Sequence, residues 1–124
     1  MHNFTFMCLT IGLIISISFN LKATETEKAT HAHLVSPEHY SVLLENDKVL
    51  VLKMTLKPGE SDEWHKHNAE TVYFESGGKA TITTKEGSKT LEITNGFTMW
   101  HDTWSHQVSN VGETTIRAII VEQK

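Results

Sequence analysis

The sequence is poor in arginine, cysteine and long apolar runs, and each shortage excludes a class of protein. Arg117 is the only arginine, no run of basic residues occurs, and the formal net charge is −4, so nucleic-acid binding is not expected. Hydrophobic residues make up 39% of the 124 residues, which is enough for the core of one domain but not for a multi-span membrane protein.

One segment differs from the rest, because residues 4–19 are almost continuously apolar. That length suits the core of a signal peptide and is short for a bilayer-spanning helix. We therefore predict a signal peptide over residues 1–23, cleaved after Ala23, and an extracytoplasmic (periplasmic or secreted) protein without a membrane anchor. An uncleaved anchor and a buried core helix are the alternatives. Cys8 is the only cysteine, so cleavage leaves a chain that must bind any metal through histidine, carboxylate, amide or water.

The remainder shows the pattern of an all-β protein. Residues 24–36 begin with a polar stretch rich in Thr and Glu, which we take as a loose leader, and residues 37–124 form the predicted domain. Residues 49–56 begin as an apolar run and end in strict alternation, which is typical of a strand with one buried face. Further short strands are expected at the following ranges: 71–74, 79–84, 90–94, 97–100, 106–108 and 114–122.

Turn residues separate these strands at short intervals. Gly77-Gly78 is expected to turn the chain into a return strand at 79–84, and Asn95-Gly96 is a strong hairpin signal because both residues tolerate positive φ. Short strands with frequent turns indicate a sandwich or a barrel.

Eight histidines are a high number for a chain of this length, and histidine is the commonest metal ligand. His65 and His67 stand two apart, so on a strand both rings point to the same face. His106 lies far along the chain, but a meandering sheet can return it to the same place. Three imidazoles suit one divalent transition metal: Fe, Mn, Ni, Cu or Zn. The same His-x-His spacing at His31 and His33 lies in the polar leader, where we do not expect a ligand.

On these residues the sequence resembles the cupin superfamily. The family's first motif is Gly, five residues, His-x-His, three or four residues, Glu, six residues and Gly. Its second motif is Gly, a Pro-x-Gly turn, then His, three residues and Asn. The matching residues here are Gly59, His65, His67, Glu70 and Gly77 for the first motif, and Gly96, His106 and Asn110 for the second. The resemblance implies a double-stranded β-helix, or jelly-roll barrel. It is greatest to small single-domain cupins often labelled β-alanine degradation protein, a pathway association that we do not transfer.

Two departures from the motifs affect the expected site. Only two residues separate His67 from Glu70, so on a regular strand their side chains face opposite sides. Glu70 reaches the metal as a fourth ligand only if the chain bulges or turns between them. A water, or Gln107 in a rearranged loop, is the alternative. The Pro-x-Gly turn is replaced by Asp102-Thr103-Trp104, which places Trp104 near the mouth of the site.

Three further residues are candidates for binding a substrate. Trp104 could cap a ligand pocket with its apolar face, Tyr73 lies on a neighbouring strand, and Arg117 could clamp a carboxylate. The structural alternatives are core packing for Tyr73 and a surface ion pair for Arg117. His101-Asp102 could form an acid–base pair, but we favour an exposed turn for these residues.

The sequence supports two classes of function. The first is a metal-dependent cupin acting on a small molecule, as a dioxygenase, isomerase or hydrolase. The second is a non-enzymatic cupin module that binds a small ligand, with or without a metal. An edge strand of the barrel could also serve as a homodimer surface.

Overall fold

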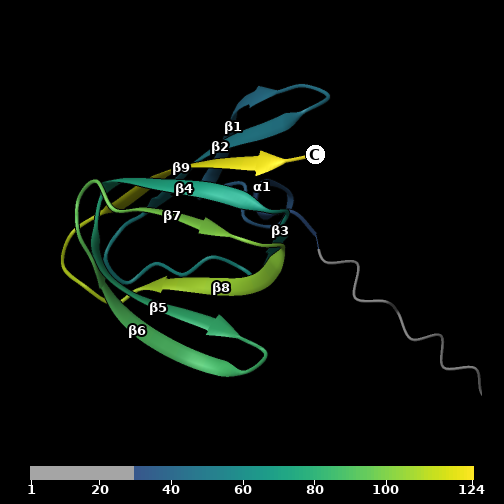
Figure 1. Ribbon diagram of the computed structural model, residues 1–124. Coiled ribbons are helices and arrows are strands. Elements are labelled where there is room, and N and C mark those ends of the chain that lie inside the picture. The colour runs from purple at the N-terminus through teal and green to yellow at the C-terminus, as the bar shows by residue number, and fades with distance from the viewer. Residues whose placement is uncertain (1–29) are drawn as a thin grey trace, which may run out of the picture.

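The computed structural model describes residues 30–124, which form two antiparallel sheets that face each other (Figure 1). The predicted signal peptide and its cleavage site lie outside the described residues, and export stays a prediction. The elements are α1 (Ala32–Val35), β1 (Tyr40–Glu45), β2 (Val49–Leu56), β3 (His65–His67), β4 (Glu70–Ser76), β5 (Gly78–Thr84), β6 (Gly87–Ile93), β7 (Thr98–His101), β8 (Trp104–Asn110) and β9 (Ile116–Gln123).

The larger sheet has five strands in the order β1-β2-β9-β4-β7. Burial alternates along its central strands, as the sequence predicts: Leu52, Met54 and Leu56 of β2 are buried, whereas Lys53 and Thr55 between them are less so. On β9, Ile116, Ala118 and Ile120 point inward in the same way. These inward side chains form one wall of the core.

The smaller sheet has four strands in the order β3-β8-β5-β6. It covers the inner face of the larger sheet, and Ala80 of β5 and Val108 of β8 contribute to the shared core. The arrangement is the jelly roll, or double-stranded β-helix, expected from the sequence. No described helix, from Thr30 onward, has the length and apolar character needed to cross a membrane.

Two connections differ from the sequence prediction. The turn at Gly77 carries the chain from β4 to β5 in the opposite sheet, so β5 is not the return strand of β4 but pairs with β6 and β8. Asn95-Gly96 likewise leads from β6 to β7 in the other sheet instead of closing a hairpin. A Cβ at Gly77 would lie 1.9 Å from the backbone oxygen of Ile93, so this crossing requires glycine.

Residues 30–36 belong to the fold and are not a loose leader. The backbone N–H of Lys66 donates to the Thr30 carbonyl at 3.1 Å, and His31 forms a bridge with Lys66 beside β3. Ala32 and Ser36 are fully buried, and the Ser36 hydroxyl accepts a hydrogen bond from the Glu63 N–H. The domain boundary expected at residue 37 is therefore too late, because this segment covers the free edge of β3.

The outer face of the larger sheet carries a row of neighbouring residues that crosses all five strands: Leu44, Val51, Val121, Thr71 and Trp100. Leu44 and Trp100 are half exposed. Edge strand β1 also exposes Val42 and Leu43. A homodimer stays a prediction from the sequence.

Candidate metal centre

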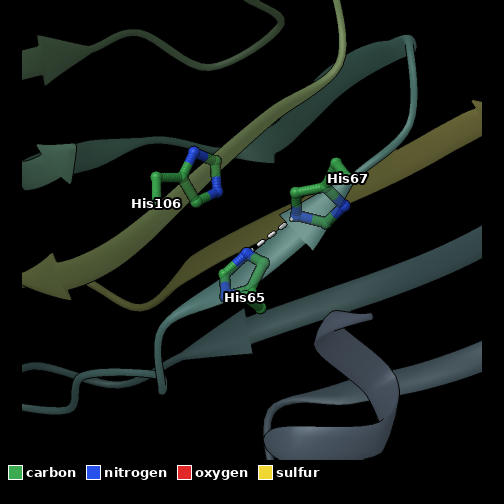
Figure 2. A group of neighbouring side chains, drawn as sticks. All are labelled: His65, His67 and His106. Atoms are coloured by element: carbon green, nitrogen blue, oxygen red, sulfur yellow. Dashed lines mark hydrogen bonds between the residues drawn. The ribbon is translucent and has the colours of Figure 1, made fainter. Parts of the chain in front are cut away.

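His65 and His67 point into the barrel from the short strand β3, as their alternate spacing predicts. Both side chains are buried, while Lys66 between them is not. His65 lies directly opposite His106 in the antiparallel register of β3 and β8. The ring centroid of His106 is 4.7 Å from that of His65 and 5.2 Å from that of His67. Figure 2 shows the three rings facing one another, so the structure brings together the three predicted histidines.

The hydrogen bonds of His65 and His67 show that both rings direct lone pairs into the cluster. His65 Nδ1 donates to the Glu63 carbonyl at 2.7 Å, and His67 Nδ1 donates to Glu122 Oε1 at 2.5 Å. In a neutral imidazole the other nitrogen is then an acceptor. The two Nε2 atoms nevertheless lie 2.9 Å apart, along the dashed line in Figure 2. Two acceptors at this distance repel each other unless a positive charge, either a metal ion or a proton added to one ring, lies between them. Imidazole nitrogens bound to one ion at about 2.0–2.1 Å and at right angles are about 2.9 Å apart.

Burial keeps two of the histidines unprotonated. Burial, together with the neighbouring His67, lowers the pKa of His65 to about 4. Burial, His67 and His65 lower the pKa of His106 to about 2. Both rings are therefore neutral at physiological pH, which is the form that binds metals. The donor set, its burial and its tautomers all fit a transition metal ion.

Glu70 enters the same interior because the chain changes sheets between His67 and Glu70. Residues 68–69 form the corner between β3 and β4, so the rule of alternation along one strand does not apply there. Glu70 is 1% exposed and its Oε2 lies 3.3 Å from His67 Nδ1. Its Oε1 accepts a hydrogen bond from Trp104 Nε1 at 2.8 Å. Burial raises the pKa of Glu70. The structure thus supplies the turn that the sequence required, and coordination by Glu70 stays a proposal.

Of the three predicted substrate residues, the structure brings only Trp104 to the site. Its ring stacks on His101 with centroids 3.7 Å apart and meets His106 edge-on at 3.9 Å. Tyr73 is 47% exposed on the outer face of β4, between the inward Val72 and Phe74. Arg117 faces outward on β9 for the same reason of alternation. Tyr73 and Arg117 therefore cannot contact a ligand inside the barrel.

Other motif residues have structural roles. The Asn110 side-chain amide donates to the carbonyls of Leu56 and Thr114, so it ties strand ends together. Gln107 donates to the Asp62 carbonyl at 2.7 Å and does not join the histidine cluster. The ring nitrogen of His101 contacts the backbone carbonyl of Asp102 and not its carboxylate. The acid–base pair, which was the alternative at His101-Asp102, is therefore not formed.

Three residues of the site were missed from the sequence. Glu122 accepts from His67, and Asp62 lies 3.7 Å from His65 Nδ1 while accepting hydrogen bonds from the Tyr40 hydroxyl and the Val108 N–H. Burial raises the pKa of Asp62 to about 6. A signal for Glu122 was present, because it continues the inward series of Ile116, Ala118 and Ile120. Asp62 and Tyr40 come from a loop and an edge strand, where no such series applies.

His67 and His106 line one end of an interior cavity of about 40 Å³. That volume holds roughly three water-sized groups. Among the described residues, its polar lining consists of Tyr40, His67, Glu70, Trp104 and His106, and its other lining is apolar: Met54, Val72, Phe74, Ala80, Ile82, Ile93, Met99, Val108, Ile116, Ala118 and Ile120.

Comparison with known proteins finds solved structures that share this architecture. No family model matches the chain, and no curated protein sequence does. Among solved structures, a cupin domain from Bordetella pertussis is 28% identical with a TM-score of 0.63, covering 68% of this chain and 91% of that one. Two others share the fold. An RmlC-like cupin with a double-stranded β-helix from Methanocaldococcus jannaschii is 15% identical with a TM-score of 0.54, covering 68% and 77%. A polyketide cyclase from Streptomyces resistomycificus is 18% identical with a TM-score of 0.54, covering 68% and 63%. The protein is a small member of the cupin superfamily.

Proposed function

We propose that this protein binds one divalent transition metal through His65, His67 and His106 and acts on a small molecule at that metal. The observation that carries the proposal is the 2.9 Å approach of two Nε2 atoms whose Nδ1 partners make both of them acceptors. Only a cation satisfies both lone pairs when the rings are neutral. Glu70 is the candidate for a fourth ligand, because its buried Oε2 makes no hydrogen bond within residues 30–124.

The cavity supports a narrow class of substrate. Its lining among the described residues contains no Lys or Arg, and beyond the polar end it is apolar. A substrate carboxylate therefore finds no side-chain cation in the cavity. We propose a small substrate with an apolar body and one or two oxygen atoms that coordinate the metal. Its apolar body would lie along the side chains lining the cavity away from the histidines, and entry of anything larger requires side chains to move.

The chain's own residues prepare the site for such chemistry. The bound ion would act as a Lewis acid or a redox centre, which suits isomerisation, hydrolysis or oxidation of the substrate. Trp104 holds Glu70 by one oxygen, so Glu70 is oriented toward the histidines. Burial raises the pKa of Glu70, so this carboxyl group can hold a proton near neutral pH more readily than an exposed one. The apolar side chains limit the water that reaches the reacting atoms.

Metal analysis tests the proposal. Protein stripped with a chelator and then supplied separately with Fe(II), Mn(II), Ni(II), Cu(II) or Zn(II) is expected to retain about one ion per chain for at least one metal. His65→Ala and His106→Ala are expected to lose it, whereas the control His39→Ala retains it, because His39 contacts Glu38 and Glu60 away from the cluster. Unfolding curves of the metal-free variants confirm that each still folds.

A wild-type chain that retains no metal, or ligand variants that bind as well as wild type, would overturn the proposal. A ligand that raises the melting temperature equally with and without metal, and is recovered unchanged, would favour the non-enzymatic binding module.

A further inference from the structure

Glu122 is a buried carboxylate at the end of an otherwise apolar face. The inward residues of β9 are Ile116, Ala118, Ile120 and Glu122, and Glu122 is 0% exposed. A carboxylate in such a position is costly unless several donors satisfy it. Glu122 also lies directly opposite Glu70 in the register of β4 and β9, where like charges repel. The buried Glu122 carboxylate therefore requires hydrogen-bond donors that stabilise it in this position.

The partners of Glu122 converge on the ligand strand β3. Oε1 accepts from His67 Nδ1 at 2.5 Å, and Oε2 accepts from the backbone N–H of Asn68 at 3.2 Å. One carboxylate thus fixes both the ring of His67 and the backbone next to it.

The three histidines differ in what supports them. His65 Nδ1 donates to a backbone carbonyl, whereas His106 Nδ1 is buried and makes no hydrogen bond within residues 30–124. His67 alone donates to a carboxylate. A carboxylate behind a metal-bound imidazole fixes its tautomer and raises its basicity.

Glu122 also lies near a partly exposed histidine. His31 Nδ1 lies 3.6 Å from Glu122 Oε2, and the His31 side chain is 36% exposed. His31 is held there by the bridge between the N-terminal segment and Lys66. No role was predicted for His31 from the sequence, and in the structure it lies next to the Glu122 carboxylate, at Oε2 and not at the Oε1 that accepts from His67.

We infer that Glu122 is a positioning residue for the metal centre and that His31 is its outer partner, forming a chain His31–Glu122–His67 from the surface to one ligand. This inference rests on the proposed function, since His67 must bind a metal. In this arrangement Glu122 presents His67 Nε2 to the ion and is not itself a ligand. The N-terminal segment thereby contributes to the affinity of a site that it does not line.

Glu122→Gln tests the inference, because glutamine keeps the shape and an acceptor oxygen but removes the charge. We expect about a 10- to 100-fold loss of Zn(II) affinity, measured by competition with a chelating dye. Glu45→Gln is the matched control at the same end of the sheet, because Glu45 is exposed and pairs with Lys124, and it is expected to bind as wild type. His31→Ala is expected to cause a smaller, few-fold loss.

A spectroscopic readout separates positioning from general destabilisation. In the Cu(II) protein, electron spin-echo envelope modulation reports the hydrogen bonding of the remote nitrogen of each bound imidazole. Glu122→Gln is expected to shift one imidazole signal, and Glu45→Gln none. Glu122→Asp, which restores the charge, is expected to recover part of the lost affinity.

The outcomes distinguish the two proposals. A wild-type chain without metal overturns the proposed function and this inference with it. A wild-type chain that binds metal, with Glu122→Gln unchanged in affinity and spectrum, overturns only the inference. Loss of an oxygen ligand from the spectrum of Glu122→Gln also overturns it, because Glu122 would then be a ligand. If Glu122→Gln does not fold, His31→Ala decides: a few-fold loss supports the chain and wild-type affinity contradicts it.

Discussion

The two ends of the barrel cavity are built by the same strands but have opposite chemistry. At the polar end Glu70 of β4 and His106 of β8 line the cavity, and Glu122 of β9 is buried next to Glu70. The next inward-facing residues on these strands, two positions away, are Val72, Val108 and Ile120. Beyond them the lining of the cavity is apolar. A change of two residues along a strand thus separates the groups suited to bind a metal from those that bury apolar surface.

This division separates the sources of stability from the sources of function. Burial of apolar side chains is the main favourable term in folding, whereas buried carboxylates and imidazoles cost free energy unless they are paired. The apolar end should therefore determine the free energy of unfolding, and the polar end should determine metal binding. Substitutions at each end test this contrast.

The largest effect is expected from Ile116→Ala at the apolar end. Ile116 is 0% exposed, so its truncation should lower the unfolding free energy by about 2–5 kcal/mol. Urea denaturation of the metal-free protein measures the loss, and metal per chain should stay at the wild-type value. Ile119→Ala, on the outer face of the same strand, is the control and should cost less. Loss of metal in folded Ile116→Ala would show that the two ends are not independent.

A moderate effect is expected from pH at the polar end. Because burial lowers the pKa of His65 to about 4 and that of His106 to about 2, neither ring must release a proton to bind metal between pH 5 and 7. Affinity should therefore fall by no more than about tenfold per unit as the pH is lowered from 7 to 5. Three ordinary histidines would lose up to roughly a thousandfold per unit well below their pKa of about 6.5. Chelator competition at pH 5, 6 and 7 measures the slope, and a slope near three would contradict the neutral cluster.

The smallest effect is expected from Trp104→Phe, which keeps a ring beside His106 but removes the donor to Glu70. Loss of one partly buried hydrogen bond to a carboxyl group should cost about 1 kcal/mol of stability. Trp100→Phe is the control, because Trp100 is exposed and its contact with Asp102 is long at 3.4 Å. Equal unfolding free energies for both variants would show that Trp104 does not hold Glu70.

Features encoded by local alternation were predictable from the sequence. The strand at residues 49–56 and the shared face of His65 and His67 follow from alternation, and His106 follows from the family resemblance. The same rule places Tyr73 between two inward residues, and applying it would have excluded Tyr73 from the cavity. It would also have found Glu122 on the inward face of the last strand.

Features that depend on the pairing of the two sheets were not predictable from local patterns. Gly77 and Asn95-Gly96 look like hairpin turns, but whether the next strand stays in the sheet is decided by packing across the core. The position of Glu70 depends on the corner at residues 68–69, which no periodicity describes. His31 and Ala32 join the fold because the edge of β3 is free to pair, a fact that emerges only from the topology.

The corner between β3 and β4 has a mechanical consequence. His65, His67 and His106 belong to the smaller sheet, whereas Glu70 and Glu122 belong to the larger one. The contacts from His67 to the two carboxylates therefore connect the two sheets at one rim of the barrel. At the opposite end of the cavity, only apolar side chains pack between the sheets. The residues that would hold the metal ion therefore also tie the two sheets together, so substitution of either carboxylate should loosen the packing of the sheets at this rim.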